Sequence, residues 1–406
     1  MMPADWWARD DLHRAADGRL IFAGKDVEAL ARAHDRPLFV YGAGRIRANL
    51  ARLRGALEAT GCAHRIHYAM KCNRFAPLLE LLAAEGARGG AVGIDICSPD
   101  ELDLALACGF RAADISFTGT SVANRDLDRL LAHPDLHINC DSLGQIRRIG
   151  ERRPGRAIGI RVNPGFGTGY GDSARLTYAG ARTTKFGIYR EQWAEALDLA
   201  ARHGLRITAI HFHVGCGYLS DQLDAWDQAV GAAAGFLADL PDATTVNVGG
   251  GLGVPHRAGD APLDLARWSA IVARHFGGRQ LTVAVEPGDY LVKDAGLLLL
   301  SVVGVERKRD TTFVAVDGGF NLHPEPAHYD LPCEPVACAL REPDPARWQP
   351  VTVAGNINEA LDLWAEDHRM PPLEEGDRIA LINAGGYGSA MSSNHCMRGA
   401  FVEMLV

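Results

Sequence analysis

Two patterns of apolar and polar positions alternate along the chain from about residue 65 to residue 285. Short runs rich in β-branched residues predict buried strands, and longer segments with apolar residues three and four positions apart predict amphipathic helices. Eight strands are expected, at 65–70, 90–97, 114–118, 136–140, 157–162, 207–214, 244–248 and 281–285. The helical segments between them are expected at 76–85, 99–108, 124–131, 143–147, 190–202, 223–237 and 263–276.

This alternation is typical of βαβ units and a parallel sheet, which places the chain in the α/β class. Eight strands with short connections fit a (β/α)8 barrel of the TIM type, in which a closed ring of strands lies inside a ring of helices. A doubly wound open sheet remains the alternative, because the number of strands alone does not exclude it.

The pattern is different on either side of this region. Strand-like runs are expected at 37–41, 291–307, 312–316, 349–353 and 378–382, with helical signals at 46–57 and, weakly, at 359–365, and an irregular proline-rich loop at 324–346. The change after residue 286 predicts a second, mostly β domain. We therefore expect a barrel domain at 36–285 and a mostly β domain made of residues 1–35 and 286–406.

The composition is that of an ordinary globular protein of 406 residues, 47% hydrophobic and 23% charged. A net charge of −8 argues against nucleic acid or an anionic membrane as a general partner. The apolar run 295–305 is too short to span a bilayer, and residues 1–9 lack the basic start and apolar core of a signal peptide. Nine cysteines without a CxxC pair fit reduced thiols, so we expect a cytoplasmic protein.

A lysine ends the first barrel strand. Lys71 directly follows the apolar run 66–70. Burying an ammonium group without a partner costs several kcal/mol, and proteins tolerate this most often where the amine forms a Schiff base with a carbonyl cofactor. A surface lysine just beyond the strand is the alternative, and the local sequence favours neither.

Polar residues and glycines also follow the other predicted strands. In chain order they are Asp95 with Ser98, Gly119, Asp141 with Ser142, Arg161 with Asn163, His211 with His213, Gly249 to Gly251, and Glu286. The carboxyl ends of barrel strands meet at one rim, where the active sites of such barrels lie. The sequence therefore predicts a functional site at that rim.

The glycine run that includes Gly250 and Gly251 follows the seventh strand, a usual position for a phosphate site in barrels. Consecutive glycines let backbone N–H groups approach an oxyanion closely. The run lacks the spacing of a dinucleotide-binding loop. A glycine-rich turn without a ligand is about as common as a phosphate site for such a motif alone.

The pair His211 and His213 lies on one face of the sixth strand and could hold a metal. No third ligand is evident, and one histidine stacked on a flat aromatic cofactor explains the site better. Glu286, in Glu286-Pro287-Gly288, could pair with a pyridine nitrogen and make the ring an electron sink, although the same residues could form a plain turn. Lysine, stacking histidine, phosphate loop and carboxylate together indicate pyridoxal 5'-phosphate (PLP) and no metal.

In these motifs the chain resembles the PLP-dependent decarboxylases of the alanine-racemase-like fold, the family of diaminopimelate and ornithine decarboxylases. The resemblance runs from about residue 36 to the end. It rests on the motifs Tyr68-Ala69-Met70-Lys71, Asp95-Ile96-Cys97-Ser98 with Glu101, Arg161-Val162-Asn163-Pro164, Lys185-Phe186-Gly187, His211-Phe212-His213-Val214-Gly215, Gly249-Gly250-Gly251-Leu252-Gly253, Glu286-Pro287-Gly288, Asp317-Gly318-Gly319, Gly355 with Glu359 and Asp362, Ala384-Gly385-Gly386-Tyr387, and Arg398 with Glu403.

The resemblance implies a role for each cofactor residue. Lys71 would form the Schiff base with PLP, His213 would stack on its ring, and Glu286 would pair with the ring nitrogen. The phosphate would be held by Gly250 and Gly251 with Tyr387, and Gly288 would belong to the same cofactor site. The family also implies a head-to-tail homodimer, in which the β domain of one subunit completes the active site of the other.

Four positions depart from the family pattern. Asn358 replaces the cysteine that usually donates a proton, Asp289 and Glu325 replace two arginines, and Cys216 replaces a serine of the phosphate site. An asparagine amide cannot donate a proton at neutral pH, so the sequence offers Lys71, His395 and Cys396 as alternative donors.

These departures affect the expected identity of the substrate. We expect the substrate to contact Asp289, Glu325, Tyr329, Asn358 and Glu359. A substrate with a distal carboxylate needs cationic side chains to bind it, and here two arginines of the family pattern are replaced by carboxylates. We therefore expect decarboxylation of an amino acid or a related biosynthetic intermediate other than meso-diaminopimelate. The alternatives are a racemase or epimerase on the same scaffold, a non-catalytic PLP-binding homologue and, less favoured, a metal hydrolase.

Overall fold

The computed structural model describes residues 5–180 and 182–406, so residues 1–4 of the expected β domain lie outside the described part. The chain divides into two compact units. The first, here called the barrel unit, consists of Leu50–Val254 and Ala261–Tyr290. The second, here called the β unit, consists of the described residues up to Asn49, with Pro255–Asp260 and Leu291–Val406.

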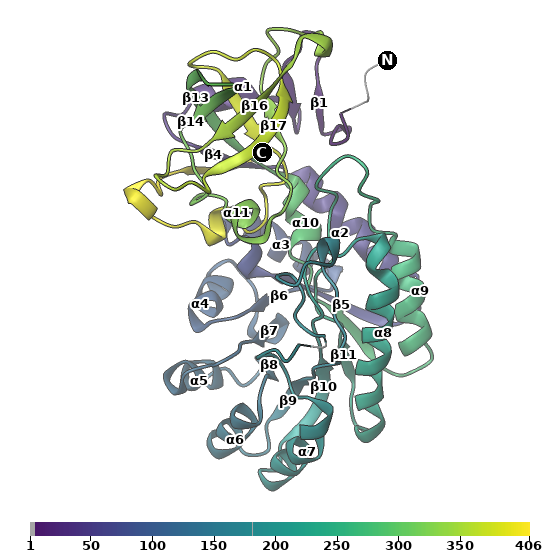
Figure 1. Ribbon diagram of the computed structural model, residues 1–406. Coiled ribbons are helices and arrows are strands. Elements are labelled where there is room, and N and C mark those ends of the chain that lie inside the picture. The colour runs from purple at the N-terminus through teal and green to yellow at the C-terminus, as the bar shows by residue number, and fades with distance from the viewer. Residues whose placement is uncertain (1–4, 181) are drawn as a thin grey trace. The chain divides into compact units, whose positions relative to one another are not determined.

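The barrel unit is built on a closed ring of eight parallel strands (Figure 1). In chain order these are β5 (Ala63–Ala69), β6 (Val92–Ile96), β7 (Ile115–Thr118), β8 (His137–Cys140), β9 (Ala157–Arg161), β10 (Arg206–His211), β11 (Thr245–Asn247) and β12 (Thr282–Val285). Pairing of β12 with β5 closes the ring, which excludes an open sheet. The predicted (β/α)8 barrel is confirmed, with each strand within a few residues of its expected position.

Helices connect these strands and surround the ring. They are α3 (Ala76–Glu85), α4 (Pro99–Ala107), α5 (Asn124–Leu131), α6 (Leu143–Arg152), α7 (Trp193–Arg202), α8 (Leu223–Ala234) and α9 (Leu265–Phe276), while α2 (Ala43–Glu58) precedes β5. The helix α5 shows why the pattern was readable: Leu127, Leu130 and Leu131 are buried on one face. Ser98 and Ser142 cap α4 and α6 directly after barrel strands.

The β unit is a mostly β structure, as expected. Its main sheet has the order β15-β18-β13-β14-β16-β17, and β4 pairs with both β13 and β19. These strands are β4 (Leu38–Tyr41), β13 (Gly296–Lys308), β14 (Thr311–Val316), β15 (Pro335–Ala337), β16 (Gln349–Ala354), β17 (Leu363–Met370), β18 (Arg378–Leu381) and β19 (Val402–Leu405). A small antiparallel sheet of β1 (Leu12–Arg14), β2 (Leu20–Phe22) and β3 (Lys25–Asp26) precedes the short helix α1 (Val27–Arg32).

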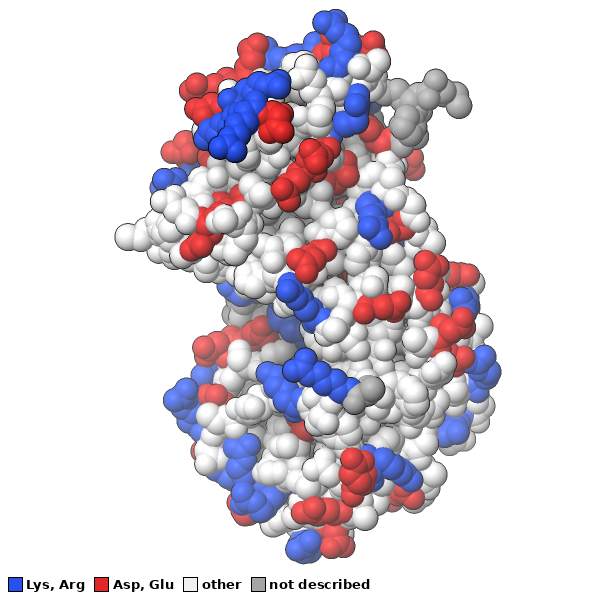
Figure 2. All heavy atoms as spheres, in the orientation of Figure 1, with Lys and Arg blue, Asp and Glu red and all other residues white. Residues whose placement is uncertain are grey.

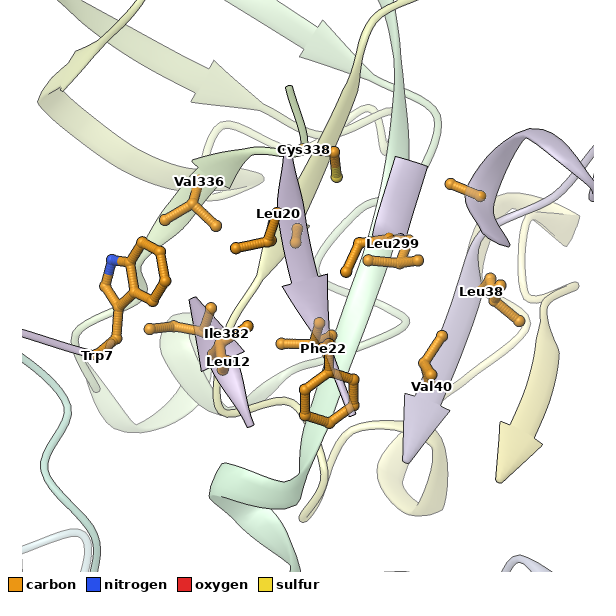
Figure 3. Packing of buried hydrophobic residues seen from close by; sticks show 14 residues of the cluster. Trp7, Leu12, Leu20, Phe22, Leu38, Val40, Leu299, Val336, Cys338 and Ile382 are labelled. Carbon is orange, nitrogen blue, oxygen red and sulfur yellow. The ribbon is translucent and has the colours of Figure 1, made fainter. Parts of the chain in front are cut away.

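The core of the β unit joins segments that are distant in sequence. Figure 3 shows Leu12 and Leu20 facing Leu299 and Ile382, with Trp7 at one end of the cluster. All five side chains are almost completely buried. The N-terminal segment is therefore part of this core. Burial of its apolar side chains away from water stabilises the β unit.

Several expectations outside the barrel strands were wrong in detail. The strand expected at 37–41 was assigned to the barrel domain, but as β4 it completes the main sheet of the β unit. The strand expected from residue 291 begins at Gly296, after the helical turns α10 (Asp289–Val292) and η8 (Lys293–Ala295). The weak helical signal at 359–365 lies in the loop before β17 and in β17 itself. The loop expected at 324–346 contains α11 (Glu325–Tyr329) and β15.

On the face drawn in Figure 2, acidic and basic side chains are interspersed. No helix within residues 5–180 and 182–406 is both long and apolar enough to cross a membrane.

Candidate active site

Lys71 lies in a single 3-10 turn, η1 (Met70–Cys72), immediately after β5. Its Nζ atom is 3.9 Å from Oδ2 of Asp95 and 3.8 Å from Sγ of Cys97, at the end of the neighbouring strand β6. The Lys71 side chain is 38% exposed and Asp95 is 1% exposed. Interactions with Cys97 and then with the Asp95 and Glu286 carboxylates raise the pKa of Lys71, whereas burial opposes them. The amine is therefore accessible and has a buried carboxylate beside it.

A cavity of about 300 Å³ opens beside Lys71 at the carboxyl ends of the barrel strands. It is lined by Lys71, Cys97, Thr118, Gly119, Thr120, Arg161, Tyr178, Phe186, His211, His213 and Glu286. The structure thus brings together residues from five strand ends that sequence reasoning placed at one rim, namely Lys71, Gly119, Arg161, His211 with His213, and Glu286. Tyr178 and Phe186 were not singled out as cavity residues, because they come from the long segment between β9 and α7.

Glu286 is a buried residue of the cavity lining and is held on both oxygens. His211 Nε2 lies 2.8 Å from Oε2, and the amide of Asn247 donates to Oε1 at 2.7 Å. Burial alone would raise the pKa of Glu286, but His211 and Lys71 outweigh it and hold the pKa below its usual range. Glu286 therefore stays ionised and fixed in position.

The two histidines of β10 and the following loop have different surroundings. His211 is bonded to Glu286, whereas Nδ1 of His213 has no hydrogen-bond partner within the described residues. Tyr178 meets the His213 ring edge-on, with ring centroids 5.2 Å apart. Burial and the nearby charge of Lys71 lower the pKa of His213, so its imidazole is neutral and leaves a flat face available for stacking.

The loop after β11 has space only for glycine. A Cβ atom at Gly250 would lie 2.0 Å from the Glu286 carbonyl oxygen, and one at Gly251, where φ is +89°, would lie 2.0 Å from the Gly215 carbonyl oxygen. The N–H of Gly249 donates to Asn247, but those of Gly250 and Gly251 donate to no group in the described part of the chain. Two adjacent backbone donors are therefore available to an anion.

Asn247 is a site residue that sequence reasoning missed. It holds both Glu286 and the glycine loop, through its Nδ2 and Oδ1 atoms respectively. Its position inside a strand, two residues before Gly249, was the available signal, because a buried amide among apolar residues needs polar partners. No group of three or more His, Cys, Asp or Glu residues within the described ranges is arranged to hold a metal ion.

The residues expected at the substrate lie in both units. Asp289 begins α10 in the barrel unit and accepts a 3.5 Å hydrogen bond from the thiol of Cys72. Glu325 and Tyr329 lie on α11, and Asn358 and Glu359 lie between β16 and β17, all in the β unit.

Glu325 and Glu359 also have partners that the sequence did not reveal. Glu325 forms a buried ion pair with Lys293, at 2.8 Å between Nζ and Oε2, so its charge is already balanced. Glu359 lies 3.5 Å from His395 Nε2. Tyr387, the residue expected at the phosphate, follows β18 in the β unit with φ of +50°.

The barrel unit fits PLP on observations that are independent of any resemblance. It offers an accessible amine, two unpaired backbone N–H donors in a loop without side chains, a buried ionised carboxylate and a neutral imidazole face. These match an aldehyde, a phosphate, a protonated pyridine nitrogen and an aromatic ring, respectively. A cavity of this volume lies within the range of ligand pockets in proteins.

Comparison with known proteins agrees with this chemistry. Residues 43–293 match the family described as "Pyridoxal-dependent decarboxylase, pyridoxal binding domain". The chain is 32% identical over 402 residues to the diaminopimelate decarboxylase of Methanothermobacter thermautotrophicus, covering 96% of this chain and 91% of that protein. It is 31% identical over 401 residues to the diaminopimelate decarboxylase of Streptomyces coelicolor, covering 94% and 87%.

A solved structure extends the similarity to the fold. The crystal structure of diaminopimelate decarboxylase from Helicobacter pylori complexed with L-lysine matches with a TM-score of 0.83 at 26% identity, covering 94% of each chain. The family match covers more than half of the chain and both relatives cover nearly all of it, so PLP is the cofactor. The chain belongs to the family of PLP-dependent amino-acid decarboxylases.

Proposed function

We propose that this protein binds PLP at Lys71 and uses it to release CO2 from an amino acid other than meso-diaminopimelate. The observation that carries the cofactor assignment is the cavity in which Lys71, His213 and Glu286 meet. Bound PLP supplies the electron sink for the electron pair that stays on the α-carbon when CO2 leaves. The residues of the chain hold the cofactor and keep its nitrogen protonated.

Each holding residue acts through a contact described above. The ionised Glu286 accepts a hydrogen bond from the pyridine N–H, and His211 with Asn247 keeps that carboxylate in place. The N–H groups of Gly250 and Gly251 donate to the phosphate, while Gly288 leaves space beside Cys72, since a Cβ there would lie 3.0 Å from Cys72 Cβ. The neutral face of His213 packs on the ring.

The cofactor assignment is tested by absorbance and covalent labelling. Purified protein with PLP should show visible absorbance that borohydride abolishes, and mass spectrometry should find the reduced cofactor on Lys71. Lys71→Ala should lose the label, and Lys185→Ala, a lysine of the same barrel unit, should keep it. A label on another lysine would overturn the role of Lys71.

The charge at the substrate residues supports a substrate without a distal carboxylate. Asp289 stands where the family has an arginine, and it is 8% exposed within the barrel unit. Glu325 replaces the second arginine, and its pairing with Lys293 leaves no excess of positive charge there. A distal carboxylate would therefore have to be bound by other groups, because neither Asp289 nor Glu325 carries the positive charge of the arginine that it replaces.

meso-Diaminopimelate is the competing substrate, because the relatives described above are named for it. The comparisons therefore give no support to its exclusion. They favour decarboxylation over racemisation, epimerisation or a non-catalytic role, since the relatives are decarboxylases. The substrate question needs a direct measurement.

A panel of L- and D-amino acids, including diamino acids and meso-diaminopimelate, separates these candidates. We expect kcat/KM for CO2 release to be at least 10-fold higher for another amino acid than for meso-diaminopimelate. Equal or faster turnover of meso-diaminopimelate would reject the substrate proposal. Uptake of solvent deuterium without CO2 loss would instead indicate the racemase or epimerase.

Two further properties belong to this proposal. The protein works as a head-to-tail homodimer, in which the β unit of one copy supplies Tyr387 to the barrel unit of the other. It acts in the cytoplasm, which nine cysteines without a CxxC pair support.

A further inference from the structure

Decarboxylation requires a proton donor, and the family position of that donor is occupied by Asn358. An amide N–H is not an acid at neutral pH. In the proposed decarboxylation, on which this inference rests, another residue of this chain must deliver the proton to the α-carbon.

Among the residues that line the cavity, Cys97 is the cysteine, and it lies beside the Lys71 amine. It lines the cavity directly after β6, and its Sγ atom is 3.8 Å from Nζ of Lys71. Its backbone is fixed, because the Cys97 N–H donates to Oε2 of Glu101 at 2.6 Å. Glu101 lies in the first turn of α4, capped by Ser98, so the segment after β6 holds the thiol at the amine.

A second, buried group is directed at the same amine. Asp95 is 1% exposed, and neither of its carboxylate oxygens has a hydrogen-bond partner within the described residues. Its Oδ2 atom lies 3.9 Å from Nζ of Lys71. Burial raises the pKa of Asp95, and a buried carboxyl group without hydrogen bonds is costly, so its position beside the Lys71 amine points to a functional role. The amine position is therefore flanked by a carboxylate and a thiol.

The Cys97 thiol carries the proton that a donor needs. Burial raises the pKa of its thiol to about 12, although Lys71 opposes this, so the proton is retained at neutral pH. The other thiols near the cavity have different contacts. Cys72 donates to Asp289, and Cys216 donates to the Tyr178 hydroxyl at 3.4 Å.

We propose that the Cys97 thiol is the proton donor to the α-carbon of the substrate. The substrate amine takes the place of the Lys71 amine, which brings its α-carbon next to the position that Cys97 faces. The bond to the carboxylate breaks, CO2 leaves, and the electron pair stays at the α-carbon. The S–H bond of Cys97 then breaks as a C–H bond forms, and the resulting thiolate regains its proton from water.

The kinetic test compares Cys97→Ala with Cys62→Ala, a change at a half-buried cysteine of the loop before β5. A general acid contributes about 10²- to 10⁴-fold to a rate, so kcat of Cys97→Ala should fall by about that factor. When the α-carbon is not protonated, the proton goes to the cofactor carbon, and hydrolysis then yields an aldehyde and pyridoxamine phosphate. The ratio of aldehyde to amine product should therefore rise at least 10-fold, and Cys62→Ala should leave both measurements within twofold.

A labelling experiment on the wild-type protein needs no variant. Iodoacetamide should alkylate Cys97 at least 10-fold more slowly in the PLP-loaded protein than after PLP removal, with Cys62 as the internal reference. Equal rates at Cys97 would overturn the proposal, because the thiol would not face the cofactor. So would a Cys97→Ala enzyme with PLP bound, kcat within threefold of wild type and an unchanged product ratio.

Failure of the donor assignment can be distinguished from failure of the function. If wild-type protein releases no CO2 from any amino acid of the panel, the decarboxylase function is wrong and the donor assignment fails with it. If wild-type protein releases CO2 and Cys97→Ala gives the same amine product at the same rate, only the donor assignment is wrong.

Discussion

At the residue scale, the cavity beside Lys71 depends on Glu286, whose carboxylate is held by His211 and Asn247. Lys71 and Glu286 were predicted because each lies at the carboxyl end of a predicted strand and bears a group that suits PLP, whereas His213 was assigned its stacking role by the family resemblance. The hydrogen bonds of Glu286 with His211 and Asn247 were not predicted, because they join β10, β11 and β12 and depend on the closure of the ring. His211 could be read as half of a metal pair until its contact with Glu286 was known.

The contact between His211 and Glu286 gives a prediction at the residue scale. His211→Asn should weaken PLP binding about 10- to 100-fold, because a hydrogen bond to a charged group contributes about 1.5–3 kcal/mol. The pKa of Glu286 should rise, since His211 helps to lower it. The PLP dissociation constant, measured by absorbance titration, checks this.

His64→Asn is the matched control, because His64 lies at the start of β5, where its ring contacts the Cys62 carbonyl. It should bind PLP as wild type does. An unchanged dissociation constant for His211→Asn would show that Asn247 alone fixes the carboxylate.

At the scale of elements, the barrel was predictable because its signals are local. Each strand carries its own apolar run and each helix its own periodicity, as Leu127, Leu130 and Leu131 show in α5. Element boundaries were less certain, because turns such as η1 and η5 (Arg190–Gln192) extend or precede the regular elements. The glycine loop was recognised by composition, whereas its close contacts required the structure.

The loop after β11 should tolerate no side chain at Gly250. Gly250→Ala should abolish PLP binding at micromolar cofactor, because the new Cβ would lie 2.0 Å from the Glu286 carbonyl oxygen. Gly144→Ala is the control, since that helical position in α6 has nothing within 4 Å of the new atom. The control should be stabilised by up to about 1 kcal/mol through helix propensity. Cofactor titration and thermal unfolding of both variants provide the measurement.

A buried histidine of β5, His67, should make the stability of the protein depend on pH. Burial lowers the pKa of His67 to about 4, below its ordinary value of 6.5. Between these values the unfolded chain binds the proton and the folded chain does not, so stability falls as pH falls from 6.5 to 4 and this contribution is complete above 6.5. His67→Gln should show a shallower loss of Tm over this range than wild type, and parallel curves would contradict the assignment.

At the scale of the whole molecule, the β unit shows the limit of reading a single sequence. Its central strand β13 pairs with β4, more than 200 residues earlier, and β4 also pairs with the C-terminal β19. Such pairings between distant segments have no local signal, which is why β4 was assigned to the barrel and why β19 was missed. The strands β1, β2 and β3 pair with one another but have only two or three residues each, too few to show an alternating pattern. The change in composition after residue 286 still identified a second, mostly β part.

The proposed homodimer makes a quantitative prediction. If Lys71 of one subunit and Tyr387 of the other serve the same site, Lys71→Ala and Tyr387→Ala proteins should each be inactive alone. After mixing and subunit exchange, half of the dimers are mixed and each mixed dimer has one intact site, so activity should return to about a quarter of wild type. CO2 release after mixing, with each variant alone as the control, is the measurement. Activity no higher than the sum of the separate variants, despite subunit exchange shown by mass spectrometry of the intact dimers, would place both residues in the site of a single subunit.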